Sequence, residues 1–513
     1  MTQSQRMVIV GAGPVGALAA LYAAQRGFAV AVYELRPGMY SSMLAFKLDC
    51  NTYLRDSAGG SLGPGQPVNL VISERGMSTL RHVGQPELLQ RVIASSVCLR
   101  GRMIHAKSAF GGLLQSSQGL DALGGTGLAI DRTALVAALL DSLDALPNVK
   151  LFFNHKLISA DFHSGRALFE DRDWLSQTTE VRFDIMVGAD GAHSTVRHSM
   201  TKVSRMDYRH EYLDVLWCEF RMKSGKAQAD GSCAWRISPD HLHIWPAGDS
   251  MFIAVPSKDG SFACTLFMPA GRFASLRADE SQIPQFFDTN FPGVRDRISD
   301  TDLIRSLSQG PHQSTISIKC KPYHFGSSGV ILGDAAHAMA LFYGQGMNEG
   351  MEDVRVLFSV LDKHAQAADA APCEGRAASS IEAARTRTRA LAEYSSSRWK
   401  DAHTTNDLAM QNYLEMRTSG STIQGLRKTL QEFTRVRLPS LGWRTRYSRV
   451  VFSNGPYAER VRGSEGQGRL LSMFAVLAAC PVVAAGLYFA CACSSSATKS
   501  GGAIHALWQW SGC

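Results

Sequence analysis

The amino-acid sequence predicts an α/β protein, in which a Rossmann-like domain with a parallel sheet is joined to a domain with an antiparallel sheet. A helical C-terminal region and one transmembrane helix are expected to follow. Three observations predict this class. Short β-branched runs alternate with helical patterns, which is typical of a parallel sheet covered by helices. Strand-rich sequence follows from Asp207 to Pro269, and residues 470–493 carry no charge.

Length and composition indicate a large folded chain. Of its 513 residues 45% are hydrophobic and 19% are charged, which excludes a disordered chain and allows two or three domains. The 11 cysteines show no CxxC pair and no Cys/His spacing typical of zinc, so we expect a reduced, intracellular chain without a metal site. A strand-like run begins directly at Met7, so no secretory signal is expected.

The net charge of +8 comes from one region. Residues 381–469 contain 16 Lys+Arg and 8 Asp+Glu, whereas residues 1–380 are close to neutral. A nucleic-acid interface would carry interleaved aromatic side chains or a known binding module, and neither is recognisable here. We therefore interpret the basic stretch as a membrane-facing surface and expect no nucleic acid as a partner.

The same patterns set the expected domain boundaries. Two stretches rich in small residues or proline, Pro37–Pro67 and Ala365–Ser380, are predicted to be loops. The expected parts are a discontinuous Rossmann-like domain (1–206 and 315–364, with strands of the second domain inserted near 67–130), an antiparallel domain (207–314), a linker with a helical region (365–469), the transmembrane helix (470–493) and a short tail (494–513).

Residues 470–493 are predicted to cross a membrane. A helix of these 24 uncharged residues is long enough for a hydrocarbon core of about 30 Å. Pro481 is tolerated in a membrane helix, and Arg460, Arg462 and Arg469 precede the span. A buried core helix is the less favoured alternative, because soluble helices seldom stay apolar on all sides. These arginines mark the cytosolic side of the span, so the main body is expected on that side.

A glycine pattern lies between a predicted strand and a predicted helix. Met7–Val10 forms the strand, and the motif GAGPVG leads into a helix rich in Ala and Leu. Gly11 permits a tight turn, Gly13 lets the backbone approach a pyrophosphate, and Gly16 allows close packing of helix and strand. A second strand ends at Glu34, whose carboxylate can bind ribose hydroxyls and disfavours a 2′-phosphate. The pattern indicates FAD or NAD rather than NADP in this pocket.

Two further motifs place a carboxylate at the end of a buried strand. Asp190 ends DIMVGAD, which is followed by GAHSTVR, and Asp334 lies in VILGDAAH, which is followed by GQGMN. Both carboxylates are expected at the ligand crevice, because the carboxyl ends of parallel strands face it. Asp334 can bond a polyol hydroxyl, and the turn from Gly344 to Asn348 can point N–H groups at an isoalloxazine ring. These features favour FAD.

The motifs GAGPVG, GADGAHSTVR and GDAAHA…GQGMN together resemble those of the single-component FAD-dependent aromatic hydroxylases, which share a p-hydroxybenzoate-hydroxylase-like fold. The stretches RMIH, LHIWP, CTLFMP and NYLEMR, together with the C-terminal span, are similar to those of the kynurenine 3-monooxygenases, especially the fungal ones. The resemblance covers about residues 6–493 apart from the two loops.

The resemblance implies an activity and its partners. In the family, FAD is reduced by NADPH, a co-substrate that binds transiently, and reacts with O2 to a C4a-hydroperoxyflavin. This species hydroxylates L-kynurenine to 3-hydroxy-L-kynurenine, a step of tryptophan degradation and de novo NAD biosynthesis. The location implied is the mitochondrial outer membrane, with the catalytic body facing the cytosol. Because the cofactor performs the chemistry, no catalytic side chain is expected.

Site residues carry over from the resemblance position by position. Arg102 is expected to bind the substrate carboxylate, since a guanidinium offers a two-pronged donor. Asn412 and Tyr447 are expected to contact the substrate, and Phe267 to line the aromatic pocket. The expected flavin contacts are Gly11, Gly13, Val15, Gly16, Glu34, Arg36, Val71, Arg132, Leu157, Asp190, Asp334, Met347 and Asn348.

The sequence departs from the family pattern at three places. Ala106–Ile130 lacks a tyrosine that helps to hold the substrate in the family, residues 46–67 replace a shorter connection, and Leu341–Tyr343 replaces Pro-Phe-Phe beside the flavin. His193 and His337 are expected to be structural.

Two other functions stay open. A hydroxylase of the same superfamily that acts on another phenol or on a polyketide would need neither Arg102 nor a membrane span. A non-catalytic flavin-scaffold protein would be either an escort of prenyl chains or a decayed enzyme. The intact Asp190 and Asp334 motifs argue against the escort, whereas the missing tyrosine leaves decay open.

Overall fold

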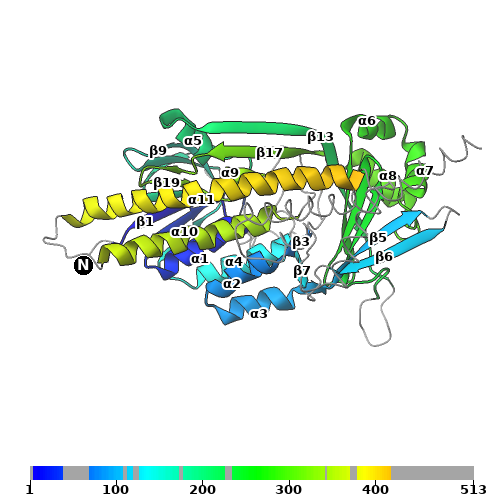
Figure 1. Ribbon diagram of the computed structural model, residues 1–513, viewed down its shortest axis with the longest axis horizontal. Helices are drawn as coiled ribbons and strands as arrows, with labels where there is room; N and C mark the ends of the chain where they lie inside the picture. Colours follow the sequence, from blue (N-terminus) through cyan, green and yellow to red (C-terminus); the bar gives the residue numbers. More distant parts are fainter. Residues whose placement is uncertain are drawn as a thin grey trace, which may run out of the picture.

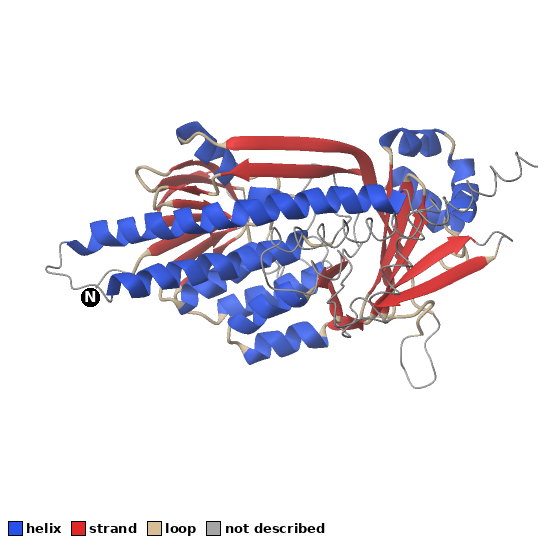
Figure 2. Cartoon of the chain, in the orientation of Figure 1, coloured by secondary structure: helices blue, strands red, loops and turns tan. Residues whose placement is uncertain are grey.

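The computed structural model describes residues 4–37, 69–107, 112–119, 126–172, 177–225, 234–340, 344–369 and 378–417. The helices and strands gather in two parts, one around a parallel sheet and one around a largely antiparallel sheet (Figures 1 and 2). Two long strands, β13 (Asp207–Met222) and β17 (Gln313–Lys321), and the long helix α11 (Ala378–Arg417) run from one part to the other (Figure 1).

A six-stranded sheet forms the centre of the first part, in the order β18-β19-β12-β1-β2-β8. All neighbouring strands run parallel except β18, which is antiparallel to β19. The apolar run Met7–Val10 is at most 5% exposed, as expected for a strand whose two faces are both covered. The strands are β1 (Arg6–Val10), β2 (Ala29–Tyr33), β8 (Val149–Phe152), β12 (Ile185–Gly188), β18 (His324–Phe325) and β19 (Gly329–Ile331).

Helices and a small sheet enclose this parallel sheet. Helix α1 packs against β1, β2, α4 and α10, and α10 packs against both α2 and α11. Helix α5 packs against β12 and β19, and β9 of the three-stranded sheet β11-β10-β9 packs against β2. The elements are α1 (Pro14–Gln25), α2 (Glu74–His82), α3 (Pro86–Ala94), α4 (Arg132–Asp144), α5 (Thr195–Val203), α9 (Asp334–His337), α10 (Gly346–Asp369), β9 (His155–Asp161), β10 (Arg166–Asp171) and β11 (Gln177–Arg182).

A seven-stranded sheet forms the second part, in the order β17-β13-β16-β15-β14-β5-β6. Its pairings are antiparallel except for β14 with β5. One face packs against α6, α7 and α8, where Phe220, Phe252 and Phe287 are at most 2% exposed. The elements are β5 (Gly101–Lys107), β6 (Leu113–Gly119), β14 (His241–Ala247), β15 (Ser250–Pro256), β16 (Phe262–Met268), α6 (Ala270–Ala278), η3 (Glu280–Gln282), α7 (Ile283–Asn290) and α8 (Asp300–Gln309).

The opposite face of the seven-stranded sheet looks toward the first part. There Phe267 and Ile244 share a buried cluster with Leu408 and Ala409 of α11. A three-stranded sheet, β3 (Asn69–Ile72), β7 (Gly127–Asp131) and β4 (Ser96–Leu99), packs beside it, and Val71 and Val255 both pack against Leu99 and Ala129. This face of the sheet is therefore largely covered by apolar side chains.

The predicted α/β class is confirmed, with its parallel sheet, its antiparallel sheet and a helical region toward the C-terminus. The predicted loop at 365–380 is too long: α10 continues to Asp369 and α11 already begins at Ala378. The reason is that alanine, which dominates this stretch, is a strong helix former.

No helix in the described ranges is long and apolar enough to cross a membrane. The segment 470–493, for which a span is predicted, lies outside the described residues, as do the tail 494–513, residues 418–469 and most of the predicted loop at 37–67.

Candidate active site

The glycine motif forms the turn between β1 and α1. Gly11 has φ 99°, and a Cβ there would lie 2.4 Å from the carbonyl oxygen of Ala189. A Cβ at Gly16 would lie 1.9 Å from the carbonyl oxygen of Gly11. A Cβ at Gly13, in contrast, would meet no protein atom within 4 Å. Gly11 and Gly16 are therefore required by the fold itself, whereas Gly13 borders open space at the N-terminus of α1, where a phosphate can approach.

Glu34 joins the glycine turn to the end of β2. It is 4% exposed, and its Oε2 accepts a hydrogen bond from the backbone N–H of Ala12 at 2.7 Å. Oε1 accepts the backbone N–H of Arg36 at 3.1 Å and lies 3.2 Å from Nε of the same arginine. A carboxylate has about four acceptor positions, so Glu34 retains capacity for ribose hydroxyls while it holds the turn.

Asp190 caps helix α5. Its carboxylate accepts hydrogen bonds from Ser194 Oγ at 2.5 Å and from the backbone N–H groups of Thr195 at 2.7 Å and Val196 at 3.1 Å. Burial raises the pKa of Asp190, and these hydrogen bonds oppose the shift. Asp190 thus stabilises the start of α5.

Asp334 opens α9 just after Gly333, whose φ is 57°. Its side chain is exposed. Desolvation by the surrounding protein nevertheless raises the pKa of Asp334, and Arg132 opposes this shift. Val15 closes one side of this turn, since a Cβ on Gly333 would lie 3.3 Å from it.

Arg132 is the centre of a charged cluster. This half-buried residue begins α4, and its Nε has no hydrogen-bond partner among the residues that the structure describes. Burial lowers its pKa, Arg36 adds to this effect, and Asp334, Glu34 and Glu219 oppose it. A donor without a partner beside the glycine turn fits the phosphate or carbonyl oxygens of a dinucleotide cofactor, so the residues present fit FAD.

The remaining expected flavin contacts lie on β3, α10 and β9. Asn348 is fully buried, and its amide joins three backbone groups: it accepts from Ser73 N–H at 2.8 Å and donates to Val71 O at 2.8 Å and Gly344 O at 3.3 Å. The side chain of Asn348 is thus committed to holding β3 against the start of α10. Met347 is half-buried beside it, and Leu157, 4% exposed, lies in the core on β9.

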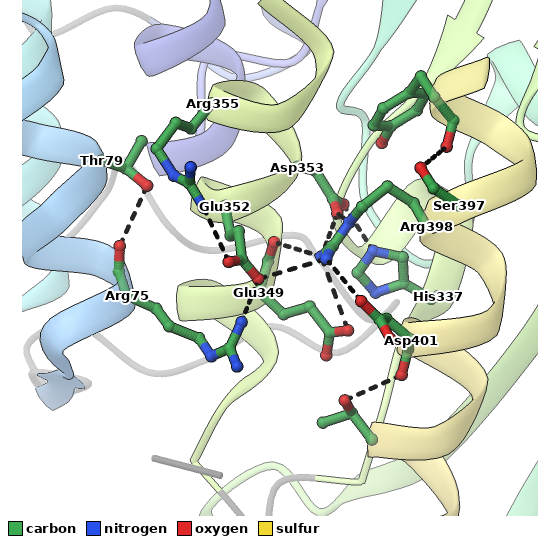
Figure 3. A network of polar contacts seen from close by, with 12 residues as sticks. Arg75, Thr79, His337, Glu349, Glu352, Asp353, Arg355, Ser397, Arg398 and Asp401 are labelled. Atoms are coloured by element: carbon green, nitrogen blue, oxygen red, sulfur yellow. Dashed lines mark hydrogen bonds and ion pairs between the residues drawn. The ribbon is translucent and has the colours of Figure 1, made fainter. Parts of the chain in front are cut away.

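Figure 3 shows a buried ionic network around Asp353 and Arg398, and a hydrogen bond to Gly333 connects it to the turn that carries Asp334. Asp353 accepts the backbone N–H of Gly333 at 2.9 Å, Nε2–H of His337 at 2.6 Å, and Nε–H of Arg398 at 2.8 Å. Burial disfavours the charged form of Asp353, but His337 and Arg398 nevertheless hold its pKa below the ordinary value. Although burial opposes it, Asp353 in turn raises the pKa of His337 to about 9, so His337 is protonated at neutral pH. The network fixes the turn that carries Asp334.

Further members of the network connect α2, α10 and α11. Arg75 Nη1 lies 2.5 Å from Glu352 Oε2, and Arg398 Nη1 lies 3.3 Å from the same oxygen. Glu349 is fully buried, and neither carboxylate oxygen has a hydrogen-bond partner in the described part of the chain; Arg398 lies 3.8 Å away. Burial raises the pKa of Glu349 to about 7. These charged residues were not predicted, because their partners come from distant helices.

The expected substrate residues lie on the second part. Arg102 on β5 pairs with Leu242 on β14, and it shares the inward face of the sheet with Phe267. Arg102 is half-buried and Phe267 is 4% exposed. Asn412 lies on α11, but its side chain is outside the described part, as is the whole of Tyr447. The structure thus brings Arg102 and Phe267 onto one face and leaves the other two untested.

Glu219 was not predicted as a site residue. It lies on β13, is 8% exposed and belongs to the surroundings of Arg132. The available signal was a single acid in the otherwise apolar run VLWCEF. In the ranges that the structure describes, no group of His, Cys, Asp and Glu side chains could hold a metal ion.

Comparisons with known proteins agree with this arrangement. The family model described as an FAD binding domain matches residues 67–372. The chain is 50% identical to the kynurenine 3-monooxygenase of Chaetomium globosum over 483 residues, which cover 92% of this chain and 96% of that protein. It is also 50% identical to the kynurenine 3-monooxygenase of Neurospora crassa, over 91% of this chain and 90% of that protein.

Solved structures share the fold at low identity. A tetrameric 2-methyl-3-hydroxypyridine-5-carboxylic acid oxygenase matches with a TM-score of 0.56 at 18% identity, covering 82% of this chain and 94% of that one. HpxO of Klebsiella pneumoniae, solved with FAD and uric acid, matches with a TM-score of 0.56 at 19% identity, covering 84% of this chain and 93% of that one. At such identities the likeness concerns the fold alone.

Proposed function

Because the chain belongs to the kynurenine 3-monooxygenase family of FAD-binding proteins, we propose that it is an FAD-dependent monooxygenase that hydroxylates L-kynurenine at ring position 3. The products are 3-hydroxy-L-kynurenine, water and NADP+, and the reaction consumes NADPH, O2 and one proton. The observation that carries this proposal is 50% identity over more than nine tenths of both chains in the Chaetomium globosum relative. Its place is the kynurenine pathway, which degrades tryptophan and supplies de novo NAD biosynthesis.

The chain's own residues would hold FAD at the cluster around Arg132. The open space at Gly13 and the N-terminus of α1 suit the pyrophosphate, and Glu34 suits the ribose. Arg132 supplies a donor that lacks a partner in the described residues, and the exposed carboxylate of Asp334 lies near enough to affect the pKa of Arg132. When bound, FAD takes two electrons from NADPH and activates O2, so that one oxygen atom enters the aromatic ring and the other leaves as water.

The substrate would lie between the inward face of the seven-stranded sheet and the flavin. Arg102 binds its carboxylate, and Phe267, Asn412 and Tyr447 complete the pocket. The support is that Arg102 and Phe267 share this face and that α11, which carries Asn412, packs on it. Apolar neighbours such as Ile244 exclude water, which protects the activated oxygen from side reactions.

The location proposed is the mitochondrial outer membrane, with the catalytic body in the cytosol and residues 470–493 as the anchor. The support is the sequence alone: 24 residues without a charge, preceded by Arg460, Arg462 and Arg469.

The experiment that tests this function uses the purified, FAD-loaded protein. NADPH oxidation is followed by absorbance with and without L-kynurenine, and the product is identified by chromatography against 3-hydroxy-L-kynurenine. L-Kynurenine should accelerate NADPH oxidation and be converted to the 3-hydroxy product. A yellow protein that hydroxylates another phenol or aniline but not L-kynurenine would refute the substrate and leave the fold assignment standing.

A further inference from the structure

One acidic side chain lies on the inward face of the seven-stranded sheet. In β13 the residues alternate, so that Cys218 and Phe220 point into the core with α6, α7 and α8, while Trp217 and Glu219 point the other way. Glu219 lies opposite Thr265 of β16. Glu219 is the one acidic residue that the strand register places on this part of the face. The strands compared are β5, β14, β15, β16 and the half of β13 that pairs with β16.

The environment of Glu219 is unusual for a carboxyl group. The residue is only 8% exposed, and Oε2 is covered without a hydrogen-bond partner in the described ranges. Leaving a buried polar atom unpaired is costly, so such an atom in a folded protein calls for an explanation. Burial raises the pKa of Glu219 to about 8, and Arg132 opposes the shift. At neutral pH the carboxyl group is therefore largely protonated and offers both an O–H donor and an acceptor.

Glu219 and Arg102 lie at opposite ends of the same face. β13 is the fourth strand from β5 in the sheet order, so the two backbones are separated by about 19 Å at the usual strand spacing. Both side chains project from this face, so a ligand that lies across the face has one of them toward each of its ends. An elongated substrate held at Arg102 by its carboxylate can thus point its aromatic end toward Glu219 and Arg132.

L-Kynurenine carries a matching group at its aromatic end. Its ring bears an amino group next to the ketone, so an N–H donor and a carbonyl acceptor lie side by side. One N–H is hydrogen-bonded to the ketone within the molecule, and a carboxyl oxygen of Glu219 can accept the other N–H, which points outward. A ring that carries no donor at this position leaves the acceptor oxygen of Glu219 unpaired, and a site built to bind a polar group discriminates against analogues that lack it.

We propose that Glu219 is a specificity-determining residue, which binds the ring amino group of L-kynurenine while Arg102 holds the carboxylate at the other end. This inference rests on the proposed function, because it assigns a role for that substrate at that site. It also accounts for the cost of keeping an unpaired carboxyl oxygen in an apolar face: stability is sacrificed for recognition.

The test measures binding rather than turnover. Dissociation constants are obtained from the change in flavin absorbance as the FAD-loaded protein is titrated with L-kynurenine, and with the analogue in which hydrogen replaces the ring amino group. The wild type should bind L-kynurenine roughly tenfold more tightly than the analogue, the difference expected for one well-placed hydrogen bond. In Glu219→Leu the ratio should approach one, and Glu219→Gln, which keeps an acceptor, should recover part of it.

Two controls separate recognition from folding. Glu211→Gln changes an acid on the same strand that pairs with Arg209, and it should leave the ratio unchanged. Thermal unfolding of Glu219→Leu should be no easier than that of the wild type, because the variant removes an unpaired buried carboxyl. If the wild type hydroxylates L-kynurenine and Glu219→Leu keeps the wild-type ratio of the two dissociation constants, the inference about Glu219 is refuted, whether or not FAD binding changes. The proposed function would still stand. A wild type that does not hydroxylate L-kynurenine would refute the proposed function as well.

Discussion

Replacing Arg398 tests whether the buried ionic network stabilises the packing of α2, α10 and α11 and the turn before Asp334. Arg398 is 3% exposed, and it contacts Asp353 through Nη2 at 2.7 Å and Nε at 2.8 Å, and Glu352 through Nη1 at 3.3 Å. Arg398→Met keeps the length of the side chain and removes its charge and donors. Two buried carboxylates then lose their shared cation, although His337 and Arg75 remain beside them.

The expected loss can be worked out from these contacts. Removing one partner of a buried ion pair costs about 3–5 kcal/mol, and the lower end applies here because His337 and Arg75 still compensate part of the two charges. At roughly 2–4 °C per kcal/mol for a domain of 150–250 residues, the melting temperature should fall by at least about 6 °C. The affinity for FAD should fall too, because Asp353 also holds the Gly333 turn in front of Asp334.

The matched control is Arg385→Met, the same change on the same helix. Arg385 is 69% exposed in its side chain and lies 3.8 Å from Glu382, and exposed pairs of this kind contribute at most about 1 kcal/mol. Thermal unfolding of both FAD-loaded variants, followed by flavin fluorescence and circular dichroism, gives the comparison. If Arg398→Met unfolded at the same temperature as Arg385→Met, the network would not have the structural role described above.

Three further predictions address Glu349, the glycine turn and the substrate clamp. Glu349 has a pKa raised from 4.5 to about 7 in the folded state, so the folded protein binds the extra proton and stability is lost as the pH rises through this window. In Glu349→Gln this loss should vanish, so the variant should gain melting temperature relative to the wild type between pH 5 and pH 7.5; parallel curves would contradict the buried, titrating carboxyl. Gly13→Ala should melt like the wild type as apoprotein but bind FAD less tightly in a fluorescence titration, because its Cβ meets open space, whereas Gly16→Ala should be destabilised even without FAD, since its Cβ would lie 1.9 Å from a carbonyl oxygen. Equal effects of the two changes would argue against a ligand at Gly13. Arg102→Ala should lower kcat/KM for L-kynurenine by at least ~30-fold while FAD stays bound, since truncating a buried charge partner costs about 2–5 kcal/mol, and Arg102→Lys should recover only part of the loss. Near-wild-type kcat/KM in Arg102→Ala would place the carboxylate elsewhere.

The elements that were predictable from the sequence are those specified by local patterns. The run Met7–Val10, the turn at Gly11 and the acid at Glu34 lie within 30 residues and define one βαβ unit, so their spacing alone predicts their geometry. The strand ends at Asp190 and Asp334 were predictable for the same reason, since a Gly-rich turn follows each buried strand.

The elements that were not predictable depend on packing between distant segments. Arg398 meets Asp353 only after α11 folds back onto α10, and no local pattern distinguishes it from the exposed arginines of the same helix. Asn348 belongs to the GQGMN motif, but its side-chain amide donates to the carbonyl oxygen of Val71 on β3, and the sequence spacing gives no sign of this contact. Glu219 becomes conspicuous only once the register of β13 places it beside Arg132 and away from the core.

The measurement that tests the central claim most directly is the origin of the new hydroxyl oxygen. The purified FAD-loaded protein is incubated with NADPH and L-kynurenine under isotopically labelled O2 in ordinary water, and the mass of the product is measured by mass spectrometry. The account predicts 3-hydroxy-L-kynurenine carrying one labelled atom, with one NADPH oxidised for each molecule formed. Absence of this product, or a hydroxyl oxygen that comes from water, would contradict it.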